Sequence, residues 1–255
     1  MAKPTTEANQ FRALAPVYDE VMRHVPYRMW VRYIHELLHS VDAAPATILD
    51  VACGTGSVAM PLAKAGYEVV GVDISAEMIE EAEAKARSAG LDIEYYAQDA
   101  AKMHLDRKFD LALSLFDSLN YIADPDSLAE TFKRIAEHLN PGGVLIFDLN
   151  TEYAFTEYLF DQDNVGTDEN PIYTWKSKYD KKAKICTVTM EFEYRDEDGP
   201  RTFTETHVQR AYSDKEIRKM LGDAGFIAIQ VYHGYSRLPP GPNTDRVFYV
   251  ARTVA

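Results

Sequence analysis

The sequence predicts an α/β fold in which a doubly wound, mainly parallel sheet carries a separate antiparallel insertion. Five short apolar runs alternate with segments of helical periodicity between residues 47 and 150, which is typical of parallel sheets with helices on both faces. From residue 172 to residue 212, apolar residues instead recur at every second position, as at Cys186, Val188 and Met190. This period predicts antiparallel strands buried on one face.

The first apolar run leads into a glycine-rich turn. Residues 48–51 indicate a buried strand, Gly54 and Gly56 interrupt it, and helical spacing begins at Val58. Glycine adopts backbone conformations closed to other residues and lets a ligand approach the main chain, while a helix start presents free N–H groups. Together with Ala59, the glycines also fit a loosened dinucleotide-binding pattern, so they do not identify the cofactor by themselves.

Asp50 gives this turn a negative charge. A carboxylate at that place repels a diphosphate but attracts an ammonium or sulfonium group in a partly dry crevice. The run Asp50-Val51-Ala52-Cys53-Gly54-Thr55-Gly56 resembles the first motif of class I S-adenosylmethionine-dependent methyltransferases. The order of helix, Pro-Gly-Gly and strand across residues 125–150 is similar to that family as well.

The resemblance covers residues 46–150 well and residues 213–252 in outline. It implies a Rossmann-like, seven-stranded sheet with an antiparallel last strand, S-adenosylmethionine as the cofactor, and methyl transfer as the activity. It also implies cofactor contacts after four strands, made by Asp50, Ala52, Cys53, Gly54, Thr55, Gly56, Asp73, Ile74, Met78, Asp99, Ala100 and Leu115.

Two of these acids have a more specific expected role. Asp73 ends the second predicted strand near the spacing at which nucleotide-binding βαβ units place an acid for the ribose hydroxyls, and a carboxylate can accept two such hydrogen bonds. By resemblance, Asp99 after the third strand binds the adenine amino group. Both residues also fit a plainer interpretation as turn or loop carboxylates.

We predict three parts in the chain. Residues 1–45 form an N-terminal helical cap, in which Trp30, Ile34 and Leu37 lie on one apolar helix face. Residues 46–150 and 213–255 form the S-adenosylmethionine-binding core, and residues 151–212 form the antiparallel insertion. Because an insertion after the fifth strand emerges at the carboxyl edge of the sheet, where ligands bind, we expect it to be a lid over the methyl acceptor.

Polar residues near that edge are candidates for the acceptor pocket. On the insertion, Glu205 and His207 share one strand face and Arg210 and Tyr212 the other, so at most one pair faces the pocket. Tyr18 and Tyr212 also fit a structural aromatic role, and His207 a structural histidine. The predicted catalytic residues are Tyr18, Asp117, Asn120, His207 and Arg210. Because the methyl donor carries its own leaving group, no metal is expected.

Composition limits the possible partners. A net charge of −13 disfavours nucleic acid as acceptor, since nucleic-acid binding depends on Lys and Arg neutralising phosphates. A long apolar run and a secretory signal are both missing, which predicts a cytoplasmic protein without a membrane partner. We expect a monomer or homodimer that methylates a small molecule at N, O or C. The alternatives are an RNA methyltransferase, an NAD-dependent oxidoreductase, or a cofactor-binding regulatory module without turnover.

Overall fold

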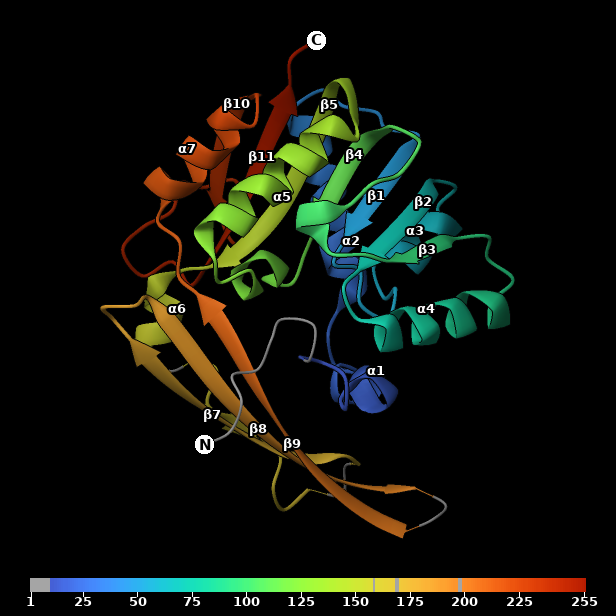
Figure 1. The fold of residues 1–255 in the computed structure, drawn as a ribbon, viewed down its shortest axis with the longest axis vertical. Helices are drawn as coiled ribbons and strands as arrows, with labels where there is room; N and C mark the ends of the chain where they lie inside the picture. Colours follow the sequence, from blue (N-terminus) through green and yellow to red (C-terminus); the bar gives the residue numbers. More distant parts are fainter. Residues whose placement is uncertain (1–9, 158, 168–169, 197–198) are drawn as a thin grey trace.

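The computed structural model describes residues 10–157, 159–167, 170–196 and 199–255. Its core is a seven-stranded sheet in the order β10-β11-β5-β4-β1-β2-β3 (Figure 1). The strand pairs β1–β2, β2–β3, β1–β4 and β4–β5 are parallel, whereas β11 is antiparallel to both β5 and β10. The predicted Rossmann-like sheet with an antiparallel last strand is therefore confirmed. The strands are β1 (Thr47–Val51), β2 (Glu68–Asp73), β3 (Glu94–Ala97), β4 (Phe109–Ser114), β5 (Leu139–Asn150), β10 (Phe226–His233) and β11 (Arg246–Thr253).

Helices cover both faces of this sheet. α2 (Tyr27–Ser40), α3 (Ala59–Lys64) and α4 (Ala76–Ser88) pack in one apolar layer, and α5 (Pro125–Glu137) and α7 (Asp214–Asp223) pack in a second. Along β1, Ile48 belongs to the first layer and Leu49 to the second, because successive strand side chains point to opposite faces. Burial on both faces explains why the parallel strands are continuous apolar runs.

Side-chain caps fix two helix starts that the sequence predicts. The Ser75 hydroxyl accepts the Met78 N–H at the start of α4. At α7, Ser213 and Glu216 form a reciprocal capping box. Such caps satisfy N–H groups that have no partner inside the helix. None of the described helices combines the length and the apolar character needed to cross a membrane.

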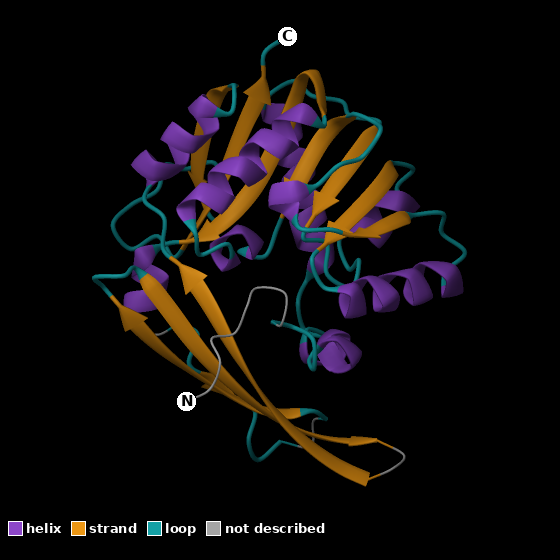
Figure 2. Cartoon of the chain, viewed as in Figure 1, coloured by secondary structure: helices purple, strands orange, loops and turns teal. Residues whose placement is uncertain are grey.

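The insertion is a second, four-stranded antiparallel sheet in the order β6-β7-β8-β9, which extends away from the carboxyl edge of the core (Figure 2). α6 (Glu152–Thr156) connects it to β5. Its inner face buries Cys186, Val188 and Met190 together with Leu14 of the N-terminal segment. The period of two thus reflects one-sided burial, as predicted. The strands are β6 (Gln162–Asp163), β7 (Ile172–Asp180), β8 (Ile185–Asp196) and β9 (Gly199–Arg210).

The predicted N-terminal cap consists of two different pieces. The segment with η2 (Ala15–Val17) and α1 (Tyr18–Val21) packs on the insertion, whereas α2 packs on the core sheet. Figure 1 shows α1 in the space between the two sheets. Residues 1–9 of the predicted cap lie outside the described residues. Two further 3₁₀ turns, η3 (Ala100–Lys102) and η4 (Ser118–Tyr121), follow β3 and β4 at the carboxyl edge.

Candidate active site

A cavity of about 690 Å³ lies between the carboxyl edge of the core sheet, the insertion and the N-terminal segment. Its volume is in the range of small-molecule sites, roughly 300–1,000 Å³. Most of the predicted site residues line it: Tyr18, Asp50, Ala52, Cys53, Gly54, Thr55, Asp73, Ile74, Met78, Asp99, Ala100, Leu115 and Asp117. Gly56, Asn120, His207 and Arg210 are outside the lining.

The glycine turn forms the floor of one end of the cavity. Ala52, Gly54 and Gly56 all have positive φ, of 58°, 53° and 77°, so the chain reverses sharply after β1. A Cβ on Gly54 would meet nothing within 4 Å, which leaves room beside the main chain on the cavity side. At Gly56 a side chain is excluded by packing, because an added Cβ would lie 2.4 Å from the Tyr95 hydroxyl.

Asp50 and Asp73 place two carboxylates at this end. Asp50 is 2% exposed, and its Oδ2 has no hydrogen-bond partner. Burial, and secondarily the charge of Asp73, raises the pKa of Asp50 to about 7. Asp73 accepts the Gly54 N–H at 2.8 Å and the Ser75 N–H at 2.9 Å, one on each carboxylate oxygen. The Ile74 N–H is a further backbone partner, and the roughly four lone-pair sites of a carboxylate still leave capacity for another donor.

Asp99 follows β3 at the same edge. Its carboxylate accepts the Ala101 N–H at 2.9 Å and pairs with Lys102 at 2.9 Å. These contacts fit the loop interpretation, and the cavity lining by Asp99 and Ala100 fits the ligand interpretation. The two are compatible, because a carboxylate held by its own turn still presents lone pairs to a ligand.

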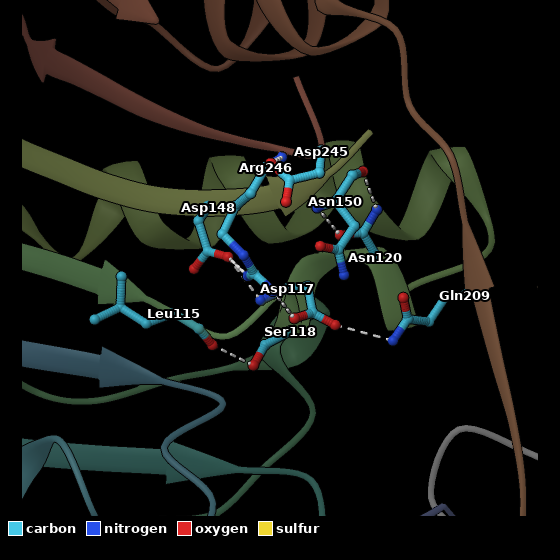
Figure 3. Close-up of polar contacts among 9 residues, drawn as sticks. All are labelled: Leu115, Asp117, Ser118, Asn120, Asp148, Asn150, Gln209, Asp245 and Arg246. Atoms are coloured by element: carbon cyan, nitrogen blue, oxygen red, sulfur yellow. Dashed lines mark hydrogen bonds and ion pairs between the residues drawn. The ribbon is translucent and has the colours of Figure 1, made fainter. Parts of the chain in front are cut away.

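A polar cluster after β4 and β5 forms another part of the cavity wall. The Arg246 guanidinium pairs with Asp117 at 2.9 Å and also with Asp148, and the Gln209 amide donates to Asp117 at 3.0 Å (Figure 3). Asp117 has a φ of 51°, a strained conformation that these contacts hold in place. The sequence does not single out Arg246, Asp148 or Gln209, because their partners lie far away along the chain.

Asp148 is completely buried, and its Oδ1 has no hydrogen-bond partner. Burial raises the pKa of Asp148 to about 6, with Arg246 opposing that rise and Asp117 adding to it. Its Oδ2 accepts the Asp117 N–H at 2.9 Å. Asp148 therefore holds Asp117 in two ways: it accepts the Asp117 backbone N–H, and it pairs with the same Arg246 that pairs with the Asp117 carboxylate.

Comparisons with known proteins agree with this geometry. Residues 48–143 match a family profile described as a methyltransferase domain. The chain is 32% identical over 243 residues to the "Putative methyltransferase YqeM" of Bacillus subtilis (strain 168), an alignment covering 95% of this chain and 96% of that protein. The chain belongs to the class I S-adenosylmethionine-dependent methyltransferases.

Two solved methyltransferase structures resemble this one over nearly their whole length. An S-adenosylmethionine-dependent methyltransferase from Clostridium acetobutylicum ATCC 824 has a TM-score of 0.84 and 32% identity, covering 95% of this chain and 98% of that one. The S-adenosylmethionine-bound amino pentose methyltransferase CalS10 from Micromonospora echinaspora has a TM-score of 0.73 and 18% identity, covering all of both chains. The CalS10 likeness shows the shared fold. S-adenosylmethionine is the methyl donor of this methyltransferase.

The residues of this methyltransferase fit the donor chemically. The unpartnered Asp50 oxygen offers a site for a cation, Asp73 has free lone pairs for hydroxyl groups, and Gly54 leaves space beside the main chain. S-adenosylmethionine, when bound, supplies a methyl group on a positively charged sulfur. A buried carboxylate is the side chain that stabilises such a cationic ligand.

Three of the methyltransferase's predicted catalytic residues lie outside the cavity lining and contact other parts of the chain. Asn120 is buried and donates to the carbonyls of Asn150 and Arg210 (Figure 3 shows the first pair). Arg210 is outside the cavity lining, pairs with Glu216 at 3.1 Å and lies over the Tyr212 ring. Arg210 is therefore placed outside the predicted acceptor pocket, because α7 offers this side chain the carboxylate of Glu216.

His207 is fully buried between Glu205 and the N-terminal segment. Its Nε2 lies 2.7 Å from Glu205, and the Phe11 ring covers it with a centroid separation of 4.3 Å. Glu205 also accepts the backbone N–H groups of Phe11, Ala13 and Leu14. The sequence predicts that at most one of the two pairs on β9 faces the pocket. The Glu205 and His207 pair is buried against the N-terminal segment, whose backbone it holds, and it lies outside the cavity lining.

The N-terminal segment is also fixed to the glycine turn and to α4. Asp19 pairs with Lys85 of α4 and accepts the Thr55 hydroxyl at 2.7 Å. Tyr18, next to it, lines the cavity, and burial raises the pKa of its hydroxyl well above the ordinary value, with nearby tyrosines and acids adding to the rise. The segment thus bridges the insertion and the glycine turn.

Proposed function

We propose that this methyltransferase transfers the methyl group to a small-molecule acceptor that binds between Tyr18, Asp117 and the inner face of the insertion. One observation carries the proposal: a single cavity continues from the glycine turn to Trp175 and Met190 of the insertion. A cavity covered in this way admits a small molecule more readily than a folded polynucleotide. CalS10, which shares this fold, is an amino pentose methyltransferase, and this supports the same class of acceptor.

The proposed catalysis relies on positioning and on exclusion of water. Asp50, Asp73 and Asp99 hold the donor, and Asp117 orients the acceptor from the opposite wall. With its raised pKa, Tyr18 keeps its proton and serves as a hydrogen-bond donor. Alignment of two bound reactants can contribute about 7–11 kcal/mol in favourable cases. The proposal includes a cytoplasmic location, since Cys53 and Cys186 are free, buried thiols.

A methyl-transfer screen tests the proposal. Purified protein is incubated with methyl-labelled S-adenosylmethionine and metabolite extracts, and total tRNA forms a second pool. Label in a small-molecule product is the expected result. Label only in tRNA would identify an RNA methyltransferase, and cofactor binding without transfer to either pool would identify a regulatory module. Tight NAD binding without S-adenosylhomocysteine binding would exclude this function altogether.

Asp73→Ala should weaken S-adenosylmethionine binding by about 1–3 kcal/mol, the usual loss for hydrogen bonds to a charged group. The same substitution also releases the Gly54 and Ser75 N–H groups, so the turn should become more mobile while the core stays folded. Calorimetry gives the affinity and circular dichroism the folding. An unchanged dissociation constant would assign Asp73 to the turn alone.

Trp175→Ala should lower methyl transfer at least about tenfold while S-adenosylmethionine affinity changes less than about threefold, roughly 0.6 kcal/mol. Trp175 lines the cavity from β7, so its removal opens the acceptor wall but leaves the glycine turn intact. Tyr179→Ala is the matched control, since Tyr179 lies on the same strand and outside the cavity lining.

Two outcomes would contradict the role of the insertion as a lid. Full activity of Trp175→Ala on the identified acceptor would make the insertion a scaffold or a contact between subunits. Equal losses in Trp175→Ala and Tyr179→Ala would indicate general destabilisation of the second sheet. Arg210→Ala adds a further check, because the position of Arg210 outside the cavity predicts nearly full activity.

A further inference from the structure

The acceptor end of the cavity has more carboxylates than cations. Asp117 and Asp148 share the single guanidinium of Arg246, so this cluster has a net negative charge when both acids are ionised. Asp148 is completely buried, and its Oδ1 has no protein hydrogen-bond donor, so Arg246 is the basic side chain that pairs with this acid. A buried excess of negative charge is unfavourable unless a positive charge comes close.

Among the described residues that line the cavity, carboxylates also outnumber basic side chains. Its carboxylates are Asp50, Asp73, Asp99, Asp117 and Asp245, and its basic side chains are Arg246 and the exposed His24. The first three carboxylates belong to the donor end. An acceptor with a carboxylate or phosphate at its reacting end would meet two further acids and one arginine whose charge is already paired. Electrostatics therefore disfavour an anionic acceptor at this end.

Aromatic rings form the rest of this wall. Trp30 stacks on Phe116 with a centroid separation of 3.9 Å, and Tyr235 meets the Trp30 ring edge-on at 5.1 Å. Tyr18 and Tyr121 line the cavity on the side of the N-terminal segment and η4. Aromatic faces attract cations, and the Arg246 guanidinium already lies over Trp30 at 5.4 Å. Carboxylates combined with aromatic faces form a binding site for organic ammonium groups.

We propose that the methyl acceptor is a primary or secondary amine whose nitrogen binds between Asp117 and the aromatic side chains Tyr18, Trp30, Phe116, Tyr121 and Tyr235. This inference rests on the proposed function and specifies its acceptor. The free lone pairs of Asp117 accept an N–H of the amine, which directs the nitrogen lone pair toward the methyl carbon. Arg246 and Gln209 keep Asp117 in its strained position.

The transfer step then balances without a further reactant. An amine that arrives as an ammonium first loses one proton to water at the cavity mouth. The nitrogen lone pair forms the new N–C bond as the S–C bond breaks, and the electron pair of that bond stays on sulfur. Positive charge thereby moves from sulfur to nitrogen, toward Asp117 and the aromatic faces, so these groups stabilise the transition state more than the neutral amine. The methylated ammonium releases a proton to solvent on leaving.

The first test measures cation binding at the acceptor end with two probes of the same shape. Benzyltrimethylammonium carries a charge and neopentylbenzene does not, and S-adenosylhomocysteine is kept saturating so that the donor end is filled. Both tryptophans of the chain, Trp30 and Trp175, line the cavity, so tryptophan fluorescence reports binding. We expect the charged probe to bind at least about tenfold more tightly, equivalent to 1.4 kcal/mol.

Asp117→Asn should remove most of that preference, because the amide keeps the shape and loses the charge. Asp126→Asn is the matched control, since it removes the same charge from an exposed position at the start of α5. Equal binding of the two probes to the unaltered protein, or an unchanged preference in Asp117→Asn, would overturn the proposal.

The second test identifies the bond that is formed. Products of the metabolite screen are made with ¹³C-methyl S-adenosylmethionine, and the carbon and proton shifts of the new methyl group distinguish N-methyl, O-methyl and C-methyl products. An N-methyl product is the expected result. Labelled O-methyl or C-methyl products would refute the amine and leave the proposed function standing. Failure of transfer to every small molecule would refute the proposed function itself.

Discussion

Gly54→Val should abolish S-adenosylmethionine binding, with the dissociation constant rising more than about 100-fold, or roughly 2.8 kcal/mol. Two effects act together. Gly54 has a φ of 53°, which a β-branched residue adopts only with strain. Its new side chain would also project into the open space beside the main chain, where we propose that the donor binds. Calorimetry with S-adenosylhomocysteine measures the loss.

Gly142→Val separates these two effects. Gly142 has a φ of 73° and open space at its Cβ, but it lies in the turn within β5 and outside the cavity lining. We expect this control variant to lose stability and to keep its affinity for the cofactor. If Gly142→Val binds as weakly as Gly54→Val, strain alone accounts for the loss and the steric argument is wrong.

Asp50→Asn should weaken S-adenosylmethionine binding at least about tenfold and stabilise the free protein at alkaline pH. Burial raises the pKa of Asp50 to about 7, so the folded chain binds more protons than the unfolded chain between about pH 4 and pH 7. The stability linked to this group is therefore present at low pH and lost as the pH rises through 7. At pH 8 the loss is at most on the order of 4 kcal/mol, at 1.36 kcal/mol per pKa unit.

Thermal unfolding of the cofactor-free proteins from pH 5 to pH 8 measures this difference. The melting temperature of Asp50→Asn should exceed that of the unaltered protein by a margin that grows with pH, and cofactor affinity of the unaltered protein should rise through pH 7. An equal margin at pH 5 and pH 8 would show that the Asp50 charge is stabilised by something other than the cofactor. Asp126→Asn, at an exposed position at the start of α5, is the matched control for removal of one acid.

The fold and the donor end of the site could be predicted because their signals are local. The strand, the glycine turn and Asp50 are consecutive, and Ser75 and Ser213 cap helices within three residues of their partners. Asp73 ends β2 and Asp99 follows β3 at the carboxyl edge. For Asp50, Asp73 and Asp99, neighbouring residues determine the backbone geometry that brings the residue to the cavity.

The acceptor end could be predicted only in part because its contacts depend on sheet packing. Alternation in β9 correctly predicts two faces, but it does not say that α7 brings Glu216 to Arg210 or that Phe11 covers His207. Arg246 begins an apolar strand, and nothing around it in sequence indicates that Asp117 and Asp148 are its partners. Charge pairs of this kind become visible only when the strand order is known.

Long sequence separations in the site also determine when it can be completed during synthesis. Glu205 binds backbone groups 191 to 194 residues earlier in the chain, and Arg246 reaches Asp117 across 129 residues. Contacts of such separation form late, because a long loop must close before they stabilise anything. The glycine turn after β1 is synthesised early, whereas the cavity wall around Asp117 is complete only after β11 has been synthesised. A ribosome-bound chain that stops before residue 246 would therefore contain the glycine turn but lack the arginine that completes the cavity wall around Asp117.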